Sequence, residues 1–320
     1  MKQSFHLNLP ILSLIVANII WGAASPIFKW SLQTTPLFTL AFIRFYGASL
    51  ILLLILRKKV FNFHKKDFPQ IFLVGFFGVT CNIIFFFLGL KLSKAINAPI
   101  IASTQPLIIF VIAVLFLKEK VKINKLMGLV LGFGGVLFII AKPFVEHGFN
   151  PEVMGDLLLL LATLGAVGQT IVAKKLMNEH KKLDPFVLTF WMFFVGTISF
   201  IPFMIPEIMN PKFTLVSLLA PQPLTGILFG VLLCSLVAYA LYMYGLSKIT
   251  ASEAGIFTYI DPIAAIAIAI PLLHETISWE FIVGSLLIFG GIWVAEHRIH
   301  YHPIRRLIKS TQISSGSTQK

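Results

Sequence analysis

The feature that most constrains this chain is a series of ten apolar runs, most of them close to 20 residues long. A helix needs about 20 apolar residues to cross the roughly 30 Å hydrocarbon core of a bilayer. Only 12% of the residues are charged, about half the share in a soluble domain. Backbone polar groups in hydrocarbon must find partners inside their own segment, so each run is predicted to be a helix. The predicted spans are residues 9–32, 36–56, 69–89, 96–117, 123–141, 155–173, 185–205, 224–246, 252–273 and 280–297.

One stretch of the sequence occurs twice in the chain. Residues 89–136 align with residues 245–292 at a constant offset of 156 residues, and 15 of the 48 aligned positions are identical. Apolar matches arise easily by chance in such a chain, whereas matches at proline, glutamate and paired glycine do not. We therefore predict an internal duplication. The matched positions include Pro106 with Pro262, Glu119 with Glu275, Gly128 with Gly284, and Gly134-Gly135 with Gly290-Gly291.

The basic residues predict how the helices are oriented. If the N-terminus is cytoplasmic, the cytoplasmic connections hold 14 Lys and Arg and the outer connections hold four, while the tail adds five more inside. This asymmetry predicts that both termini are cytoplasmic. Five helices in each repeat then give the repeats opposite orientations, an architecture typical of secondary transporters. The predicted fold is an all-α polytopic membrane protein with ten transmembrane helices in two inverted five-helix repeats, residues 1–141 and 155–297, followed by a basic, polar cytoplasmic tail, residues 298–320.

The first helix is predicted to be retained. Lys2 followed by an apolar run, with Gly22-Ala23-Ala24 as a passable cleavage site, has some features of a signal peptide. The apolar run continues past that site to Leu32, which favours a transmembrane helix.

Several short motifs together carry a family resemblance. They are Trp21-Gly22, Lys29, Pro36, Arg44, the two Pro-x12-Glu motifs that begin at Pro106 and Pro262, and the duplicated glycines. The chain resembles an EamA-type carrier of the drug/metabolite transporter superfamily across nearly its whole length. The resemblance implies ten helices, two EamA repeats and movement of small organic metabolites, often outward, and it implies no particular substrate. Asp261 departs from the pattern, because the residue before this proline is usually uncharged in the family.

Two charged residues are predicted to lie deep in the membrane. Arg44 is eight residues into the second predicted helix, which at 1.5 Å per residue places it roughly 12 Å below the outer surface, near the midplane. Asp261 is nine residues into the ninth predicted helix and is also near the midplane. An ionised group there costs at least about 2.5–3 kcal/mol, so each is expected to face a cavity or a partner. Asp261 precedes Pro262, and its repeat mate Gln105 precedes Pro106. Both prolines are predicted to kink or break their helices near mid-membrane.

Six residues are predicted to line a central substrate cavity: Trp21, Arg44, Asn82, Gln105, Tyr239 and Asp261. The alternatives for the two charges are that Asp261 and Arg44 only neutralise each other, that each pairs with backbone groups, or that Arg44 snorkels to water. For Trp21 and Tyr239 the favoured alternative is packing between helices. Asn82, like Asn18 and Gln169, is of a type that also bonds neighbouring helices.

Other polar residues near the helix ends have structural interpretations. Lys29 is predicted to snorkel to the outer surface as an anchor. Glu119 and Glu275 are each predicted to cap the helix that follows them, in preference to carrying protons. Five glycines are predicted to permit close helix packing: Gly128, Gly132, Gly135, Gly284 and Gly291.

We predict a secondary carrier, and an exporter, for a small organic metabolite in a plasma membrane, working by alternating access. The main alternative is a membrane receptor or scaffold that binds a ligand without moving it. A channel is disfavoured, because no ring of charges or repeated filter sequence is present. His274-Glu275 lacks the second histidine of a zinc-protease motif and there is no phosphate-binding loop. We therefore predict no enzymatic activity, no cofactor and no metal, with a small-molecule solute and the lipid bilayer as partners and no nucleic acid. Substrate, coupling ion and oligomeric state are left open.

Overall fold

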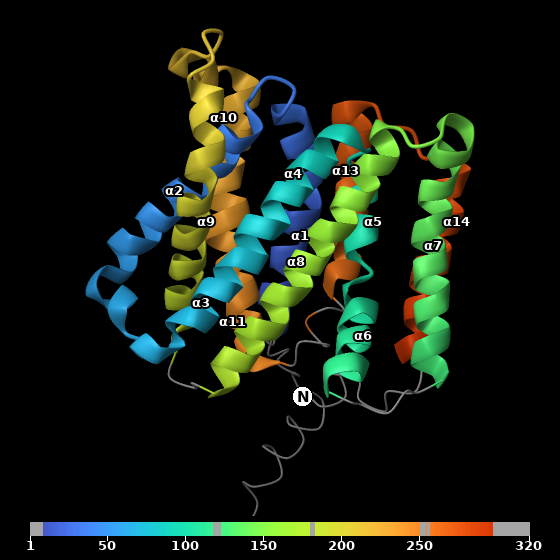
Figure 1. Ribbon diagram of the computed structural model, residues 1–320, viewed down its shortest axis with the longest axis horizontal. Coiled ribbons are helices and arrows are strands. Elements are labelled where there is room, and N and C mark those ends of the chain that lie inside the picture. The colour runs from blue at the N-terminus through green and yellow to red at the C-terminus, as the bar shows by residue number, and fades with distance from the viewer. Residues whose placement is uncertain (1–8, 118–122, 180–182, 250–253, 255–256, 297–320) are drawn as a thin grey trace, which may run out of the picture.

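The computed structural model describes residues 9–117, 123–179, 183–249, 254 and 257–296, and every regular element within them is a helix (Figure 1). The predicted tail, residues 298–320, lies outside the described residues. The first half contains α1 (Leu9–Ser31), α2 (Leu37–Leu56), α3 (Phe68–Gly75), the π-helical segment η3 (Phe76–Cys81), α4 (Asn82–Leu92), α5 (Asn97–Ala102), α6 (Gln105–Leu117) and α7 (Ile123–His147). The second half contains α8 (Pro151–Glu179), α9 (Pro185–Ile208), α10 (Pro221–Leu228), the π-helical segment η5 (Phe229–Tyr239), α11 (Ala240–Lys248), the 3-10 turn η6 (Phe257–Ile260), α13 (Asp261–Leu273) and α14 (Trp279–Glu296).

These elements form the ten predicted helical segments. In the described part of the chain, seven helices are long and apolar enough to cross a membrane, and three shorter apolar helices, Asn97–Ile112, Phe257–Leu273 and Trp279–Val294, supply the rest. The predicted all-α fold of two five-helix repeats is confirmed. The shorter segments include the two predicted spans that carry Pro106 and Pro262, and both of these are interrupted. α7 continues to His147 and α8 begins at Pro151, so the two halves are joined by a shorter connection than predicted.

The packing of the helices follows the duplication. α2 packs on its repeat mate α9, and α7 packs on its mate α14, as Figure 1 shows at the right edge of the molecule. The two long helices α1 and α8 also have corresponding partners. α1 packs on η5, α11 and α13 of the second repeat, and its mate α8 packs on η3, α4, α5 and α6 of the first repeat. Exchanging the halves therefore reproduces the contacts, as expected for repeats related by an approximate two-fold axis.

This exchange sorts the central helices into two groups, each drawn from both repeats. We call α1, η5, α11 and α13 the α1 bundle, and α8, η3, α4, α5 and α6 the α8 bundle. Each bundle joins one long helix of one repeat to the third and fourth helices of the other. The two bundles therefore face each other across the centre of the molecule, between the α2–α9 pair and the α7–α14 pair.

Glycine permits the close approach of α7 and α14. A Cβ added to Gly135 would lie 2.5 Å from the Gly284 carbonyl oxygen, and one added to Gly291 would lie 2.5 Å from the Gly128 carbonyl oxygen. The two contacts are two-fold mates of each other. Within a membrane, small residues at such crossings let backbones pack directly, and this role was predicted for these four glycines.

The neighbouring glycines provide a matched test of this packing. A Cβ added to Gly134 or Gly290 would meet nothing within 4 Å. Gly135→Ala is expected to lower stability by about 1–3 kcal/mol, because the methyl group overpacks the crossing. Gly134→Ala is expected to raise stability by about 0.5–1 kcal/mol through helix propensity. Thermal melting of the purified variants measures both, and equal shifts for the two would contradict the packing role.

Candidate functional site

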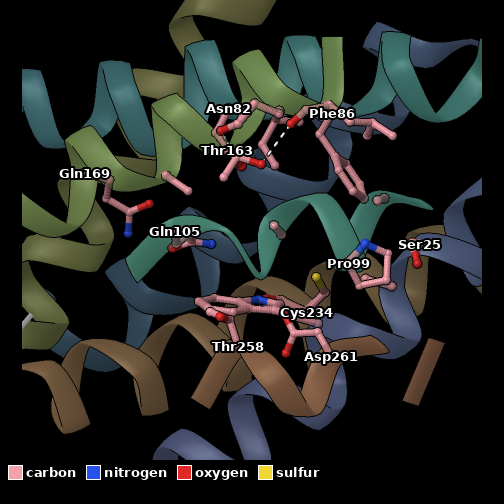
Figure 2. Close-up of a pocket in the computed structure, with 18 of the residues that line it drawn as sticks. Ser25, Asn82, Phe86, Pro99, Gln105, Thr163, Gln169, Cys234, Thr258 and Asp261 are labelled. Carbon is pink, nitrogen blue, oxygen red and sulfur yellow. Dashed lines mark hydrogen bonds between the residues drawn. The ribbon is translucent and has the colours of Figure 1, made fainter. Parts of the chain in front are cut away.

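A cavity of about 130 Å³ lies between the two bundles, and all six predicted residues are on its walls. An apolar cavity of comparable size holds a benzene molecule. Figure 2 shows Asn82, Thr163 and Gln169 on one side and Cys234, Thr258 and Asp261 on the other, with Gln105 between them. The wall from the α1 bundle and α2 includes Trp21, Ser25, Phe28, Arg44, Cys234, Tyr239, Tyr242, Thr258 and Asp261, and the wall from the α8 bundle includes Asn82, Phe86, Pro99, Gln105, Thr163, Gln169 and Thr170.

Asp261 is the first residue of α13 and is 7% exposed. Its Oδ1 atom has no hydrogen-bond partner among the described residues. α1 comes close to it at Gly22, where an added Cβ would lie 2.8 Å from the Asp261 Cα. A buried carboxylate oxygen without a partner is costly, so this is the group on the cavity wall that most needs a ligand or a proton.

Arg44 is held inside the protein rather than at its surface. Its Nε donates to Ser235 Oγ at 2.7 Å and its Nη2 contacts Cys234 Sγ at 3.0 Å. The guanidinium also lies over the rings of Phe28 and Phe45, 4.9 and 4.6 Å from their centroids. With 2% exposure, Arg44 does not snorkel, so that interpretation is wrong.

The two charges are not an ion pair. Arg44 has hydrogen-bonding and aromatic partners from α1, α2 and η5, and Asp261 is not among them. Mutual neutralisation by direct contact is therefore contradicted. The cavity wall carries a cation that is already engaged by protein groups and an acid whose Oδ1 is not.

The aromatic residues both pack and line the cavity. Trp21 Nε1 donates to the Cys234 carbonyl at 3.2 Å, and its ring centroid lies 4.9 Å from those of Tyr239 and Tyr242. The Tyr239 hydroxyl donates to the Gly78 carbonyl at 3.3 Å. These contacts give the Asp261 side of the cavity a rigid aromatic surface with its polar atoms already bonded.

The opposite wall is neutral and polar. Asn82 Nδ2 donates to the Ala162 carbonyl at 2.7 Å, which bonds α4 to α8 as one of its two predicted roles requires. Gln105 and Gln169 also lie on this wall, from α6 and α8. Amides and hydroxyls here can both donate to and accept from a solute.

Both interrupted helices place a polar residue at the point of interruption. A turn at Ser103 and Thr104 separates α5 from α6, and Gln105-Pro106 begins α6. The 3-10 turn η6 precedes α13, which Asp261-Pro262 begins. Proline is well suited to the first turn of a helix because its missing N–H is not needed there. The repeat mates Gln105 and Asp261 are thereby brought to the cavity in equivalent ways.

Sequence reasoning missed the two π-helical segments. η3 and η5 occupy corresponding places in the third and eighth predicted spans, and the hydrogen bond from Tyr239 to Gly78 joins one to the other. Such segments occur often at functional sites. The pattern of apolar residues does not reveal them, because the change from α-helical to π-helical hydrogen bonding leaves the residue composition of the span unchanged.

Sequence reasoning also missed Asp156, which is fully buried near the start of α8. Its Oδ1 accepts hydrogen bonds from Ser93 Oγ and from Asn97 Nδ2. Asp156 is the second residue of the predicted span 155–173, and a position at the end of a span gives no sign that the side chain is buried.

The predicted cap by Glu275 is wrong. Glu275 does not cap α14; its carboxylate accepts from the backbone N–H groups of Ala95 and Ile96, at 2.7 and 3.1 Å. Lys29 is partly exposed, as its predicted anchor role requires, and its Nζ lies 3.5 Å from Glu275 Oε1 and also donates to the Ser93 carbonyl. The backbone N–H groups that begin a helix lack intrahelical acceptors and compete for a nearby carboxylate.

Two further polar residues can be placed against their predictions. The Asn18 side chain donates to the Leu14 carbonyl of its own helix, at 2.7 Å, and so reaches neither the cavity nor another helix through that bond. Glu119 lies outside the described residues, so its predicted cap stays a prediction.

Known proteins resemble this chain in sequence and in fold. The sequence pattern of the EamA-like transporter family matches residues 8–141 and 153–295. An uncharacterized transporter of Archaeoglobus fulgidus is 27% identical over 90% of this chain and 98% of its own length. The uncharacterized transporter YetK of Bacillus subtilis is 26% identical over 88% of this chain and 85% of its own length. A protein of known crystal structure superposes with a TM-score of 0.62 over 89% of this chain and 96% of its own, at 17% identity, which supports the fold alone.

The environments of Arg44 and Asp261 predict unequal effects on stability. Arg44→Gln is expected to lower the melting temperature, because hydrogen bonds from a charged group contribute about 1.5–3 kcal/mol each and a packed site is emptied. Asp261→Asn is expected to leave it unchanged or raised, because an unpartnered buried carboxylate is removed. Thermal melting of the purified proteins measures both.

The double variant Arg44→Gln with Asp261→Asn is the control for charge pairing. The two single effects are expected to add in it, because the two side chains are not in direct contact, so it should stay less stable than the wild type. Recovery of wild-type stability in the double variant would show that the two charges neutralise each other and would refute the arrangement described above.

Proposed function

We propose that this chain, which belongs to the EamA-like transporter family, is a secondary carrier that exports a small polar or amphipathic organic solute. One observation carries the proposal: the cavity lies between two bundles, each built from both repeats, and it presents the unpartnered Oδ1 of Asp261. A site between inverted repeats is where alternating access exposes a solute to each side in turn.

The walls suggest how a solute is held. Asp261 supplies an oxygen that lacks a protein partner and is available to a donor group of the solute or to a coupling proton. Trp21 and Tyr239 supply apolar contact, and Gln105 across the cavity supplies an amide. A solute that binds both walls would shift the equilibrium toward closed states through its differential affinity. Rocking of the α1 bundle against the α8 bundle then opens the site first to one face of the membrane and then to the other.

The membrane topology, that is, which side of the membrane each connection lies on, is part of the proposal. We propose a plasma-membrane location with both termini cytoplasmic, supported by the 14-to-4 split of Lys and Arg between the two sets of connections. The short connection after α2 is then cytoplasmic and the connection between α7 and α8 is outside.

Single cysteines at Lys58 and Asn150, in a chain without Cys81 and Cys234, test this orientation. Lys58 follows α2 and Asn150 precedes α8. An impermeant thiol reagent added to intact cells is expected to label the cysteine at Asn150 and not the one at Lys58. Labelling of both from the same side would contradict the inverted repeats.

Transport itself can be tested once a solute is found by thermal shift, since a ligand of the folded state raises its melting temperature. Proteoliposomes should then take up that solute with saturation and with stimulation by solute preloaded on the far side. Asp261→Asn is expected to abolish or uncouple uptake while melting stays close to that of the wild type. Glu179→Gln, a charge-removing change at an exposed pair with Lys175, is the matched control and should transport normally.

The same assay separates the carrier from its alternatives. Saturable binding without uptake would identify a receptor or scaffold, and uptake without saturation or counterflow would identify a channel. Normal uptake by the Asp261→Asn protein would refute the role given to this residue.

A further inference from the structure

A polar network closes one end of the cavity, the end where α1 finishes and α8 begins. Residues 93–96 connect α4 to α5 there, and we call them, together with Asn97 at the start of α5, the corner. Lys29 donates to the Ser93 carbonyl of the corner, and Glu275 accepts from the corner's Ala95 and Ile96 N–H groups. Lys29 and Glu275 also contact each other at 3.5 Å. Three separate parts of the chain meet in this network, at the uppermost end in Figure 1.

The contacts that Lys29 and Glu275 make with the corner cross from one bundle to the other. Lys29 is on α1, and Glu275 follows His274, the residue that caps the end of α13, so both belong with the α1 bundle. The corner belongs to the α8 bundle, where Asp156 of α8 holds it through Ser93 and Asn97. Opening this end by moving the bundles apart therefore requires the bonds of Lys29 and Glu275 to break, while the bonds of Asp156 can stay intact.

The other end of the cavity has a cross-bundle contact with the roles of the bundles exchanged. Lys174 of α8 donates to the Leu246 carbonyl of α11 at 2.9 Å. One turn earlier on each helix, the hydroxyls of Thr170 and Tyr242 hydrogen-bond at 3.0 Å. As at the first end, a lysine near the end of the long helix of one bundle bonds a carbonyl at the end of a helix in the other.

We propose that these contacts are a pair of reciprocal latches: Lys29 and Glu275 lock the first end of the cavity, and Lys174 locks the second. The proposal rests on the alternating access proposed above, which requires one end to open while the other stays closed. The Lys29 and Glu275 side chains are 26% and 10% exposed, so water can reach their site as they separate. Water then replaces the lost partners, which lets charged latches open more readily than fully dry ones.

The latches predict opposite changes in accessibility, which one native thiol can report. The chain has two cysteines, and Cys234 lies on the cavity wall. In a Cys81→Ser background, the rate at which a charged, impermeant methanethiosulfonate reagent modifies Cys234 measures how often the cavity opens to the side from which the reagent is added. This measurement needs no knowledge of the solute.

Removing the first latch should open only its own end. Lys29→Met and Glu275→Gln are each expected to speed modification of Cys234 about tenfold from the face that bears Lys29, since one charge-assisted bond shifts an opening equilibrium by about that factor. Lys174→Met should speed modification from the opposite face instead. Lys29→Arg keeps the charge and should stay close to the wild-type rate.

Lys94→Met is the matched control. Lys94 is at the same end, and its pair with Glu152 at 3.9 Å stays within the α8 bundle. Its removal should leave both rates unchanged. The proposal is refuted if Lys29→Met behaves like Lys94→Met, if it raises both rates equally, or if Cys234 stays unreactive in the Lys29 and Glu275 variants.

The result is independent of the transport assay. One-sided changes in Cys234 modification would support the latches even if a protein that gates in this way proved to move no solute. A carrier that transports but shows no one-sided change would retain the proposed function and lose the latches.

Discussion

Backbone hydrogen bonding in a dry environment is the constraint on which this structure depends. Hydrocarbon offers no partners to peptide groups, so a chain of this composition has to be helical wherever it meets lipid. Departures from regular helix are tolerated only where protein or a cavity covers them. The described departures obey this rule: the turn at Ser103 and Thr104, the 3-10 turn η6, and the π-helical segments η3 and η5 all lie in the two bundles that enclose the cavity. The irregular backbone segments and the cavity therefore occur in the same part of the molecule.

The depth of polar residues could be read from the sequence, because rise per residue converts position into distance from the surface. Depth selected Trp21, Arg44, Gln105 and Asp261, residue type added Asn82 and Tyr239, and all six lie on the cavity wall. The partner of each residue could not be read in the same way. Arg44 was weighed as the counter-ion of Asp261, yet it bonds Ser235 and Cys234. Depth restricts a side chain to a layer, whereas its partner depends on helix rotation and packing.

The same limit explains the helix ends. Lys29 and Glu275 were assigned to water and to the following helix, because sequence shows only neighbours along the chain. The N–H groups of Ala95 and Ile96 that bond Glu275 are 180 and 179 positions away from it and belong to the other repeat. The Ser93 carbonyl that Lys29 bonds is 64 positions away from Lys29 in the same repeat. The duplication, in contrast, was fully visible, since a two-fold relation imposes matching small residues on both copies. The glycines at the α7–α14 crossing satisfy that relation in pairs.

The charges in the cavity break the symmetry that the helices keep. Arg44 aligns with Phe193 of the second repeat, and Asp261 aligns with Gln105 of the first, so each charged residue corresponds to a neutral residue in the other repeat. A two-fold scaffold gives its two exchanged conformations closely similar packing. Any difference in free energy between them must then come from positions where the repeats differ. Because a ligand shifts an equilibrium only by its differential affinity for the two states, we propose that Asp261 and Arg44 are among the positions through which a solute or a proton biases the proposed cycle.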